Sequence, residues 1–155
     1  MISEKDFEKI QKEIENFFEK TTFNVNIEFS ISKENEISAK IKTEEPKILI
    51  GEKGETLSEI QHLLRIIIKR RIKTEELFHL DIDINDYKKK KSFYLKELAR
   101  SVAREVILTK KETILPPMPA YERKIIHLEL ANNPNIETKS IGEEPERQIM
   151  IKPYP

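Results

Sequence analysis

The segment LIGEKGETL (residues 49–57) constrains the fold of this chain more than any other. It contains two of the chain's three glycines, Gly51 and Gly54, separated only by Glu52 and Lys53. An apolar run precedes the pair and an apolar-periodic segment follows it. Because glycine lacks a Cβ, the pattern predicts a tight turn between two helices at which another backbone can approach closely.

The spacing of apolar residues predicts the elements around this turn. Helical spacing over 3–20 and 57–72 predicts two amphipathic helices, with Ser3 as the N-cap of the first. Strict alternation predicts three strands, over 23–31, 37–41 and 80–84. The first two strands are expected to form a hairpin. With a short helix before the glycine pair, the order expected for residues 1–85 is α-β-β-α-α-β.

The remaining residues predict a second set of elements. A long helix is expected over 86–111, with an apolar stripe made of Tyr94, Leu95, Leu98, Val102 and Val106. Three prolines, the last of them Pro119, precede another helix that ends at the motif NNPN. Two short strands then follow. The whole chain is therefore expected to have an α+β fold, with a domain boundary inside the long helix.

Charge is distributed unevenly along a chain that is neutral as a whole. Residues 60–111 contain 14 Lys and Arg against 7 Asp and Glu. This local positive field would attract a polyanion, whereas the plainer alternative is a solvated, lysine-rich helix surface. The run Lys88–Lys91 lies at the start of the long helix, where cations oppose the helix dipole. We therefore interpret these lysines, Lys88 and Lys89 in particular, as contacts for phosphates.

Several classes of protein do not fit the sequence. It has no cysteine for disulfide or thiol chemistry, and no signal peptide or apolar run of membrane-spanning length. A cytoplasmic protein is therefore expected. Asp81, Asp83 and Asp86 suggest a Mg²⁺ site, but alternation with apolar neighbours favours a solvent-facing strand surface, and no metal is expected. His62 and His79 are interpreted as surface residues. With no catalytic constellation, we expect neither an enzyme nor a cofactor.

Two kinds of phosphate-binding loop compete for the glycine pair. A Walker loop requires Lys and then Ser or Thr after its last glycine, and here Glu55 and Thr56 follow Gly54. A Gly-x-x-Gly turn between two helices instead suits a sugar–phosphate backbone, because helix N–H groups supply partial positive charge beside it. The bases would enter an aliphatic groove made by Ile48, Ile50, Leu57 and Ile60.

The stretch ILIGEKGETLSEIQHLLRIII resembles the core of a KH domain, and the predicted order of elements is that of the prokaryotic, type II arrangement. The resemblance implies a clamp on about four nucleotides of single strand. Its contacts would be Ile50, Gly51, Glu52, Lys53 and Gly54, supported by Arg65 and Lys69 on the following helix. Glu52 departs from the pattern, because this position often carries a basic residue in the family. The alternative is a degenerate KH fold retained for pairing with another KH domain.

A second motif lies in AYERKIIHLEL, where Arg123 and His127 are four residues apart. This spacing places them about 40° apart around a helix, so that both can reach one ligand. A guanidinium suits phosphate, and an imidazole adds a donor or stacks on a base. An isolated pair at this spacing is usually a coincidence of the surface. Here Thr138 and Ser140 follow on one face of a strand.

The string from PPMPAYERKIIH through TKSIGEEPER to IMIKP resembles the R-3-H domain, a small binder of single-stranded nucleic acid. The resemblance implies six contact residues. They are Arg123, Lys124, His127, Thr138, Ser140 and Arg147.

A KH domain followed directly by an R-3-H domain is the order of the bacterial Jag (SpoIIIJ-associated) family. The joining segment NDYKKKKSFYLKELARSVA also resembles that family's link. We therefore expect a KH domain over 1–85, a connecting helix over 86–111 that belongs partly to the second domain, and an R-3-H domain over 112–155. A counterpart of the family's N-terminal Jag-N module is not expected before Ser3.

The family resemblance implies a cytoplasmic regulator that acts post-transcriptionally by binding single-stranded RNA, with single-stranded DNA as an alternative ligand. The family is linked to cell elongation and sporulation. The resemblance also implies pairing with a small KH-only protein or with a second copy of the chain. The rival interpretation is a protein-interaction adaptor that dimerises through its KH domain and whose nucleic-acid binding is vestigial.

Overall fold

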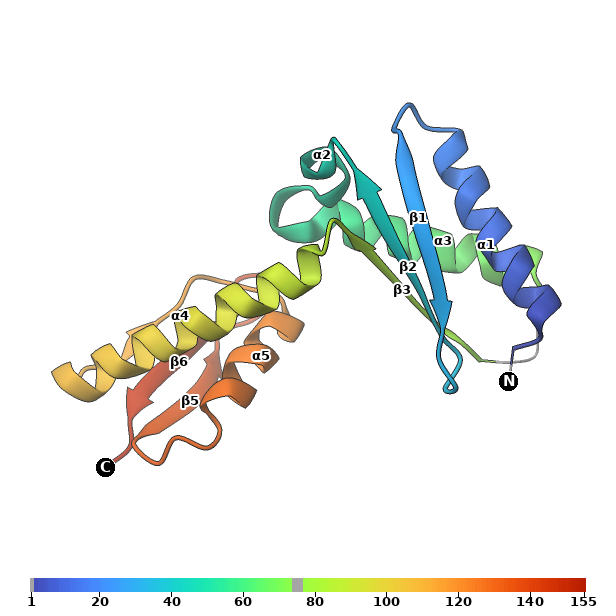
Figure 1. Cartoon of the computed structure of the whole chain (residues 1–155). Helices are drawn as coiled ribbons and strands as arrows, with labels where there is room; N and C mark the ends of the chain where they lie inside the picture. Colours follow the sequence, from blue (N-terminus) through green and yellow to red (C-terminus); the bar gives the residue numbers. More distant parts are fainter. Residues whose placement is uncertain (1, 74–76) are drawn as a thin grey trace. The chain divides into compact units, whose positions relative to one another are not determined.

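A computed structural model describes residues 2–73 and 77–155 of the chain. It has the α+β fold that the sequence predicts, and its described strands form two three-stranded sheets. The chain divides into two compact units (Figure 1), which we call the N-terminal unit (Met1–Lys88) and the C-terminal unit (Lys89–Pro155). The division falls near the start of the long helix.

The N-terminal unit has the element order that the apolar spacing predicts, α-β-β-α-α-β. The short 3₁₀ turn η1 lies between its second and third helices. The elements are α1 (Glu4–Glu19), β1 (Val25–Ile31), β2 (Glu36–Thr43), α2 (Pro46–Ile50), η1 (Glu52–Gly54), α3 (Glu55–Arg71) and β3 (His79–Ile84).

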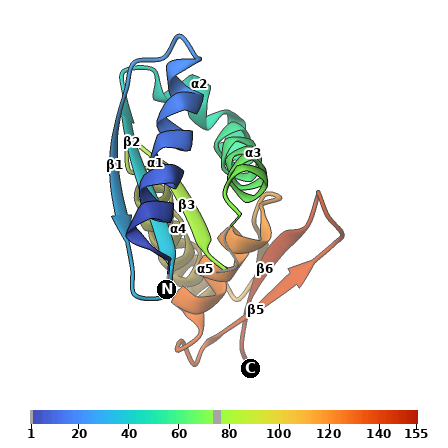
Figure 2. The ribbon, with the colours of Figure 1, turned by 90° about the vertical axis from the view of Figure 1, so that its right-hand side faces the viewer.

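The sheet of the N-terminal unit has the strand order β1-β2-β3. β1 and β2 form the expected antiparallel hairpin, whereas β2 and β3 are parallel, with Ile37 opposite Leu80. Helices α1 and α3 cover one face of this sheet (Figure 2). Alternate strand residues therefore enter the core with the apolar sides of both helices. Among the fully buried core residues are Ile10, Ile14, Phe18, Ile37, Ile41, Leu64, Ile68, Leu80, Ile82 and Ile84.

The start of α1 confirms the predicted cap. The Asp6 amide donates to Ser3 Oγ at 3.1 Å, and Ser3 Oγ in turn donates to Asp6 Oδ2 at 2.9 Å. Hydrogen bonds from Lys9, first, and from Ser3 hold the pKa of Asp6 below its ordinary value. These contacts satisfy N–H groups that the first helical turn would otherwise leave without partners.

The C-terminal unit packs two helices against a second antiparallel sheet, which has the order β4-β6-β5. Its core combines one side of each helix with inward residues of β5 and β6, including Leu95, Ala99, Val106, Ile126, Ile149 and Ile151. The elements are α4 (Tyr87–Thr109), which begins in the N-terminal unit, β4 (Thr113–Ile114), α5 (Ala120–Leu130), β5 (Ile136–Ile141) and β6 (Gln148–Pro153).

Two features of this unit differ from the prediction. The sequence places Tyr94 in the buried stripe of the long helix, but Tyr94 is exposed, and Ala99 occupies the stripe with Leu95, Val102 and Val106. The reason is angular, since Tyr94 lies about 100° from Leu95 around the helix. The two-residue strand β4 is not predicted by the sequence. In the described part of the chain, no helix is both long and apolar enough to cross a membrane.

Candidate nucleic-acid interface

The glycine loop turns the chain between α2 and α3 through three residues of positive φ. Gly51, Lys53 and Gly54 have φ of 73°, 51° and 82°. The Gly51 amide ends α2 by donating to Lys47 O at 3.0 Å, and no side chain caps the start of α3. Glu52 and Lys53 are exposed at the tip, so the loop presents two charged side chains beside the uncapped N-terminus of α3.

Both glycines also have a reason inside the protein. A Cβ on Gly51 would lie 2.8 Å from Thr56 Cβ and 2.9 Å from the Thr56 backbone nitrogen. A Cβ on Gly54 would lie 3.0 Å from Tyr87 Cε1 and 3.1 Å from the Tyr87 hydroxyl oxygen. The sequence alone attributes the missing side chains to the approach of a ligand. In the structure, close packing against Thr56 and Tyr87 already requires them.

The aliphatic groove expected beside the loop is smaller than predicted. Leu57 is only 3% exposed and belongs to the core, so it cannot receive a base. Ile48 is exposed, and Ile50 and Ile60 are half-buried. The apolar surface next to the glycines is therefore provided by α2 and by one side chain of α3.

The basic residues predicted on α3 have different surroundings. Lys69 is exposed and Arg65 is half-buried. Arg71 is not among the predicted contacts, and it pairs with Glu13 of α1 through Nη1 and Oε2 at 2.7 Å. Of the predicted contacts, Arg65 and Lys69 therefore add positive charge along α3, where Arg70 is also exposed.

The lysine run at the start of α4 is divided by its partners. Lys88 forms an ion pair with Asp81, and its Nζ also donates to Gln61 Oε1 at 3.1 Å. Asp83 Oδ1 accepts the Lys88 backbone amide at 3.1 Å, which places a carboxylate at the positive end of the helix. Asp81 and Asp83 thus offset the unfavourable interaction of the lysines with the helix dipole. These contacts already engage the Lys88 ammonium group, so a phosphate at Lys88 would have to compete with Asp81.

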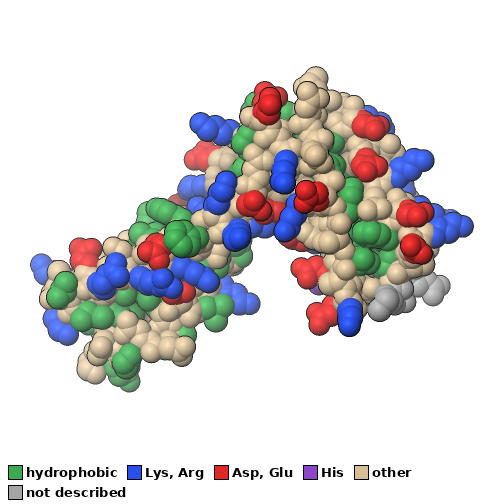
Figure 3. All heavy atoms as spheres, in the orientation of Figure 1, with side chains coloured by type: hydrophobic (Ala, Val, Ile, Leu, Met, Phe, Trp, Pro, Cys, Tyr) green, Lys and Arg blue, Asp and Glu red, His purple; other side chains and the backbone are tan. Residues whose placement is uncertain are grey.

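Lys89 and Lys90 are exposed, in contrast to Lys88. On the face drawn in Figure 3, Lys and Arg side chains gather along α4. Lys91 is half-buried, and its Nζ lies 3.6 Å from Glu122 Oε1 of α5 and 6.0 Å from the centre of the Tyr94 ring. Of the two lysines singled out in this run, Lys89 is therefore the one whose side chain remains accessible.

Arg123 does not lie open on the surface as the spacing predicts. Its residue is 6% exposed, Nη1 donates to Met118 O at 2.6 Å, and Nη2 donates to Glu144 Oε1 at 2.6 Å. A buried guanidinium needs such partners, because an unpaired one would be strongly disfavoured. Arg123 thus ties α5 to the chain before it and to the β5–β6 connection, and its two terminal nitrogens are already engaged.

His127 lies beside Arg123 on α5 and faces Thr138 and Ser140 of β5. Its Nδ1 is 2.7 Å from Thr138 Oγ1, and its Nε2 is 3.0 Å from Ser140 Oγ. Burial, and secondarily the positive charge of Arg123, holds the pKa of His127 below its ordinary value. Imidazole and two hydroxyls therefore form a half-buried, uncharged polar cluster at neutral pH.

The last two predicted contacts lie on either side of this polar cluster in the sequence. Lys124 is exposed on α5. Arg147 is half-buried, its carbonyl accepts the Met118 amide at 3.2 Å, and its Nε is buried with no hydrogen-bond partner. Sequence reasoning missed Glu144, the partner of Arg123, and Tyr87, the partner of Gly54. Glu144 and Tyr87 are far in sequence from Arg123 and Gly54, so the sequence gives no signal that these residues come into contact.

Comparison with known proteins identifies the C-terminal unit first. Residues 94–153 match the R-3-H domain family, a range that contains all six predicted contacts from Arg123 to Arg147. The chain is 41% identical over 104 residues to the RNA-binding protein KhpB of Lactiplantibacillus plantarum, 67% of this chain and 32% of that protein. It is 32% identical over 127 residues to the RNA-binding protein KhpB of Clostridium symbiosum, 82% of this chain and 56% of that protein.

The chain belongs to the Jag/KhpB family. A further relative, the RNA-binding protein KhpB of Bacillus subtilis, is 35% identical over 72% of the chain and 53% of that protein. Because the Clostridium match covers 82% of the chain, the similarity extends well ahead of the R-3-H segment. The chain spans between a third and somewhat over half the length of these relatives. All three are named for RNA binding and none for a catalytic activity, which agrees with the expectation that this family member is not an enzyme.

Proposed function

We propose that the protein binds single-stranded RNA, with the N-terminal unit acting as a KH domain and the C-terminal unit as an R-3-H domain. The observation that carries the proposal is the exposed Gly-x-x-Gly turn within an α-β-β-α-α-β unit, on the same chain as an R-3-H domain. Supporting it, relatives of both units are named RNA-binding proteins. The role of a post-transcriptional regulator belongs to the same proposal.

The N-terminal site consists of the loop and the surface beside it. Gly51 and Gly54 adopt the positive φ that this tight turn requires, and no side chain caps the start of α3, so a phosphate group can approach the N–H groups there. Lys53 supplies a positive charge at the tip, and Arg65 and Lys69 supply others along α3. Glu52 opposes phosphate at the same tip. Ile50 and Ile48 offer apolar surface for bases.

The C-terminal site consists of the accessible polar residues around the buried Arg123. Lys124 contacts phosphate as a charged group, while His127, Thr138 and Ser140 provide donors and acceptors for a base or a 2′-hydroxyl. Lys89 adds charge at the start of α4, and Arg147 presents its guanidinium from the β5–β6 connection. Arg123 itself shapes this surface and holds it in place.

A loop variant tests the N-terminal part of this proposal. We expect Glu52→Asp with Lys53→Asp to weaken binding of a random single-stranded RNA pool, because two carboxylates would face the phosphates, while the fold measured by circular dichroism stays the same. The matched control is Lys47→Asp in α2, an exposed cation one turn before the loop. Unchanged affinity in the folded loop variant would remove the glycine turn from the site.

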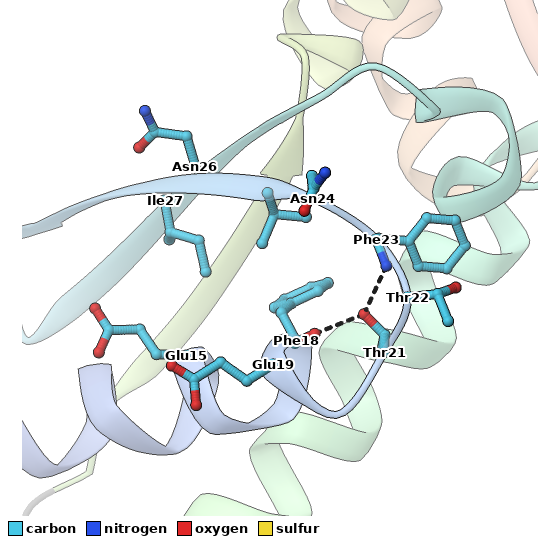
Figure 4. Close-up of a pocket in the computed structure, with 10 residues that line it drawn as sticks. Glu15, Phe18, Glu19, Thr21, Thr22, Phe23, Asn24, Asn26 and Ile27 are labelled. Carbon is cyan, nitrogen blue, oxygen red and sulfur yellow. Dashed lines mark hydrogen bonds between the residues drawn. The ribbon is translucent and has the colours of Figure 1, made fainter.

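The adaptor interpretation is supported by a different observation. β1 is an edge strand, and a pocket of about 650 Å³ lies between it and the end of α1 (Figure 4). Phe18, Phe23 and Ile27 line it, and Thr21 Oγ1 donates to Phe18 O at 2.6 Å to hold the turn there. An edge with an adjacent pocket suits a partner strand, whether from a KH-only protein or a second copy. A chain that forms such a complex and binds no RNA would favour this function.

A further inference from the structure

We propose that Tyr94 of α4 and Tyr121 of α5 form a stacking surface for unpaired RNA bases. This inference rests on the proposed function and deepens it, since it assigns a base-binding site to two residues that neither the glycine loop nor the Arg-x-x-x-His motif includes. Both tyrosines lie in the C-terminal unit.

Both tyrosine rings are exposed to solvent, so packing in the core does not account for them. Tyr94 is 58% exposed and Tyr121 is 50% exposed, although each lies one position from a buried residue of its helix. Tyrosine has a large π surface and loses little conformational entropy when it is held in place. Base–aromatic stacking does not depend on the base identity, because every base has a π face.

A largely buried ion pair connects the two tyrosines. Glu122 is 3% exposed, and its Oε1 accepts the Tyr121 hydroxyl at 3.0 Å and lies 3.6 Å from Lys91 Nζ. That same Nζ lies 6.0 Å from the centre of the Tyr94 ring, within the range of a cation–π contact. One carboxylate oxygen thus fixes Tyr121 directly and Tyr94 through Lys91. Glu122 and Lys91 are positioning residues, and the rings are the contact groups.

The exposed side of α5 connects this pair to the proposed R-3-H site. Tyr121, Lys124 and His127 are three residues apart, so each lies about 60° from the next around the helix, with Lys124 in the middle. A strand whose phosphate meets Lys124 can place one nucleotide toward His127, Thr138 and Ser140. Its neighbour then lies toward Tyr121.

The charge near the tyrosines selects a nucleic acid as the occupant. The first ten residues of α4 contain five lysines and no acidic residue. Of these lysines, Lys88 and Lys91 already have carboxylate partners, which leaves Lys89, Lys90 and Lys96 exposed. Lys90, four residues before Tyr94, and Lys124, three residues after Tyr121, are the exposed cations on the same side of each helix as the ring. A ring beside an exposed cation matches the combination of flat bases and phosphates along a single strand.

The test uses the full chain with two strands of the same length. One is a single-stranded RNA that carries 2-aminopurine, whose fluorescence reports stacking, and the other lacks bases but keeps every phosphate. Tyr94→Leu and Tyr121→Leu are compared with Tyr94→Phe and Tyr121→Phe, which retain the rings. Phe93→Leu is the matched control, because Phe93 is 70% exposed on a different face of α4. Circular dichroism checks the fold of each variant.

We expect each Leu variant to weaken binding of the base-bearing strand roughly fivefold or more and to reduce the 2-aminopurine response. Binding of the abasic strand should stay the same. Tyr94→Phe and Phe93→Leu should bind like the unchanged protein. Tyr121→Phe keeps the ring but loses its hydrogen bond to Glu122, so its loss of affinity should be smaller than that of Tyr121→Leu. If Tyr121→Leu does not fold, Tyr94→Leu and the Phe variants still decide the matter.

Two results would overturn the inference while leaving the proposed function intact. The first is a set of folded Leu variants that bind the base-bearing strand as the unchanged protein does. The second is an equal loss for both strands, which would show that the tyrosines act through charge or fold. If the unchanged protein binds neither strand, the proposed function itself fails, and the stacking surface fails with it.

Discussion

Arg123 Nη2 and Glu144 Oε1 form an ion pair at 2.6 Å that joins α5 to the connection between β5 and β6. Nη1 of the same guanidinium donates to Met118 O, so one side chain binds segments on both sides of its helix. The arginine of the Arg-x-x-x-His motif is therefore part of the architecture of the R-3-H domain. His127, four residues later, is left to face the strand hydroxyls.

Removal of this guanidinium should destabilise the C-terminal unit. We expect Arg123→Ala to lower its free energy of unfolding by about 2–3 kcal/mol, since two hydrogen bonds of a charged donor are lost and the Met118 carbonyl is left unpaired. Glu144→Gln retains an acceptor and should cost about 1 kcal/mol. Hydrogen exchange of the β5 and β6 amides measures both effects. Equal protection in Arg123→Ala and the unchanged protein would refute the structural role.

The glycine loop should respond differently at its two ends. Gly51→Ala is expected to destabilise the N-terminal unit by about 1–3 kcal/mol, because φ is positive and the new Cβ meets the Thr56 backbone, which cannot rotate away. Gly54→Ala meets the Tyr87 side chain instead. The free-energy cost of Gly54→Ala should therefore fall when Tyr87→Leu is added. The strain of placing alanine at positive φ should remain.

A double-mutant cycle on Gly54 and Tyr87, with stability measured by urea unfolding, isolates this coupling. Gly142→Ala serves as a control, because that glycine also has positive φ but has more space, with its nearest atom 3.5 Å from the added Cβ. Additive effects at Gly54 and Tyr87 would show that the ring does not restrict the loop.

Neighbouring lysines at the start of α4 should contribute unequally to RNA binding. Lys89→Ala is expected to reduce the slope of log affinity against log salt by about 0.7, the value for one phosphate contact on a single strand. Lys88→Ala should change the slope much less, because Asp81 and Gln61 already engage its ammonium group. Titrations at several salt concentrations compare the two variants directly. Equal slope changes would contradict the division of the lysine run.

Acidification should destabilise the C-terminal unit through His127. Burial lowers the pKa of His127 from its ordinary value of 6.5, so just below that pH the unfolded chain binds a proton that the folded chain does not. Stability is therefore lost as pH falls below about 6.5 and down to the lowered pKa. His127→Gln should reduce this loss in thermal melts run at a pH about one unit above and one unit below 6.5. Asp6 does not contribute to this change in stability, because its pKa is lowered from 3.8 and its carboxylate stays ionised over this pH range.

Local elements were predictable because their signals are local. Alternation from Phe23 to Ile31 marks β1, and the hairpin with β2 follows from the short turn between them. The parallel pairing of β2 with β3 was not predicted, since the periodicity of each strand says nothing of its partner. Likewise, helical spacing placed Arg123 and His127 near each other but could not show that Arg123 faces inward to Glu144.

Contacts between distant elements also explain the differences between the predicted and the observed candidate site. The sequence correctly places Thr138 and Ser140 on one strand face, and both contact His127. It assigns Lys88 to phosphate because the partners of Lys88, Asp81 and Gln61, come from other elements. It assigns Tyr94 to the core because the ring stands next to Leu95 in the sequence, whereas the two residues lie about 100° apart around the helix.

The most direct test of single-stranded RNA binding is a titration with a random-sequence single-stranded RNA pool, run beside an RNA duplex at several salt concentrations. We expect the chain to bind the single strand more tightly than the duplex, with an affinity that falls steeply as salt rises. Equal affinity for both forms, or no binding to the single strand at low salt, would contradict it.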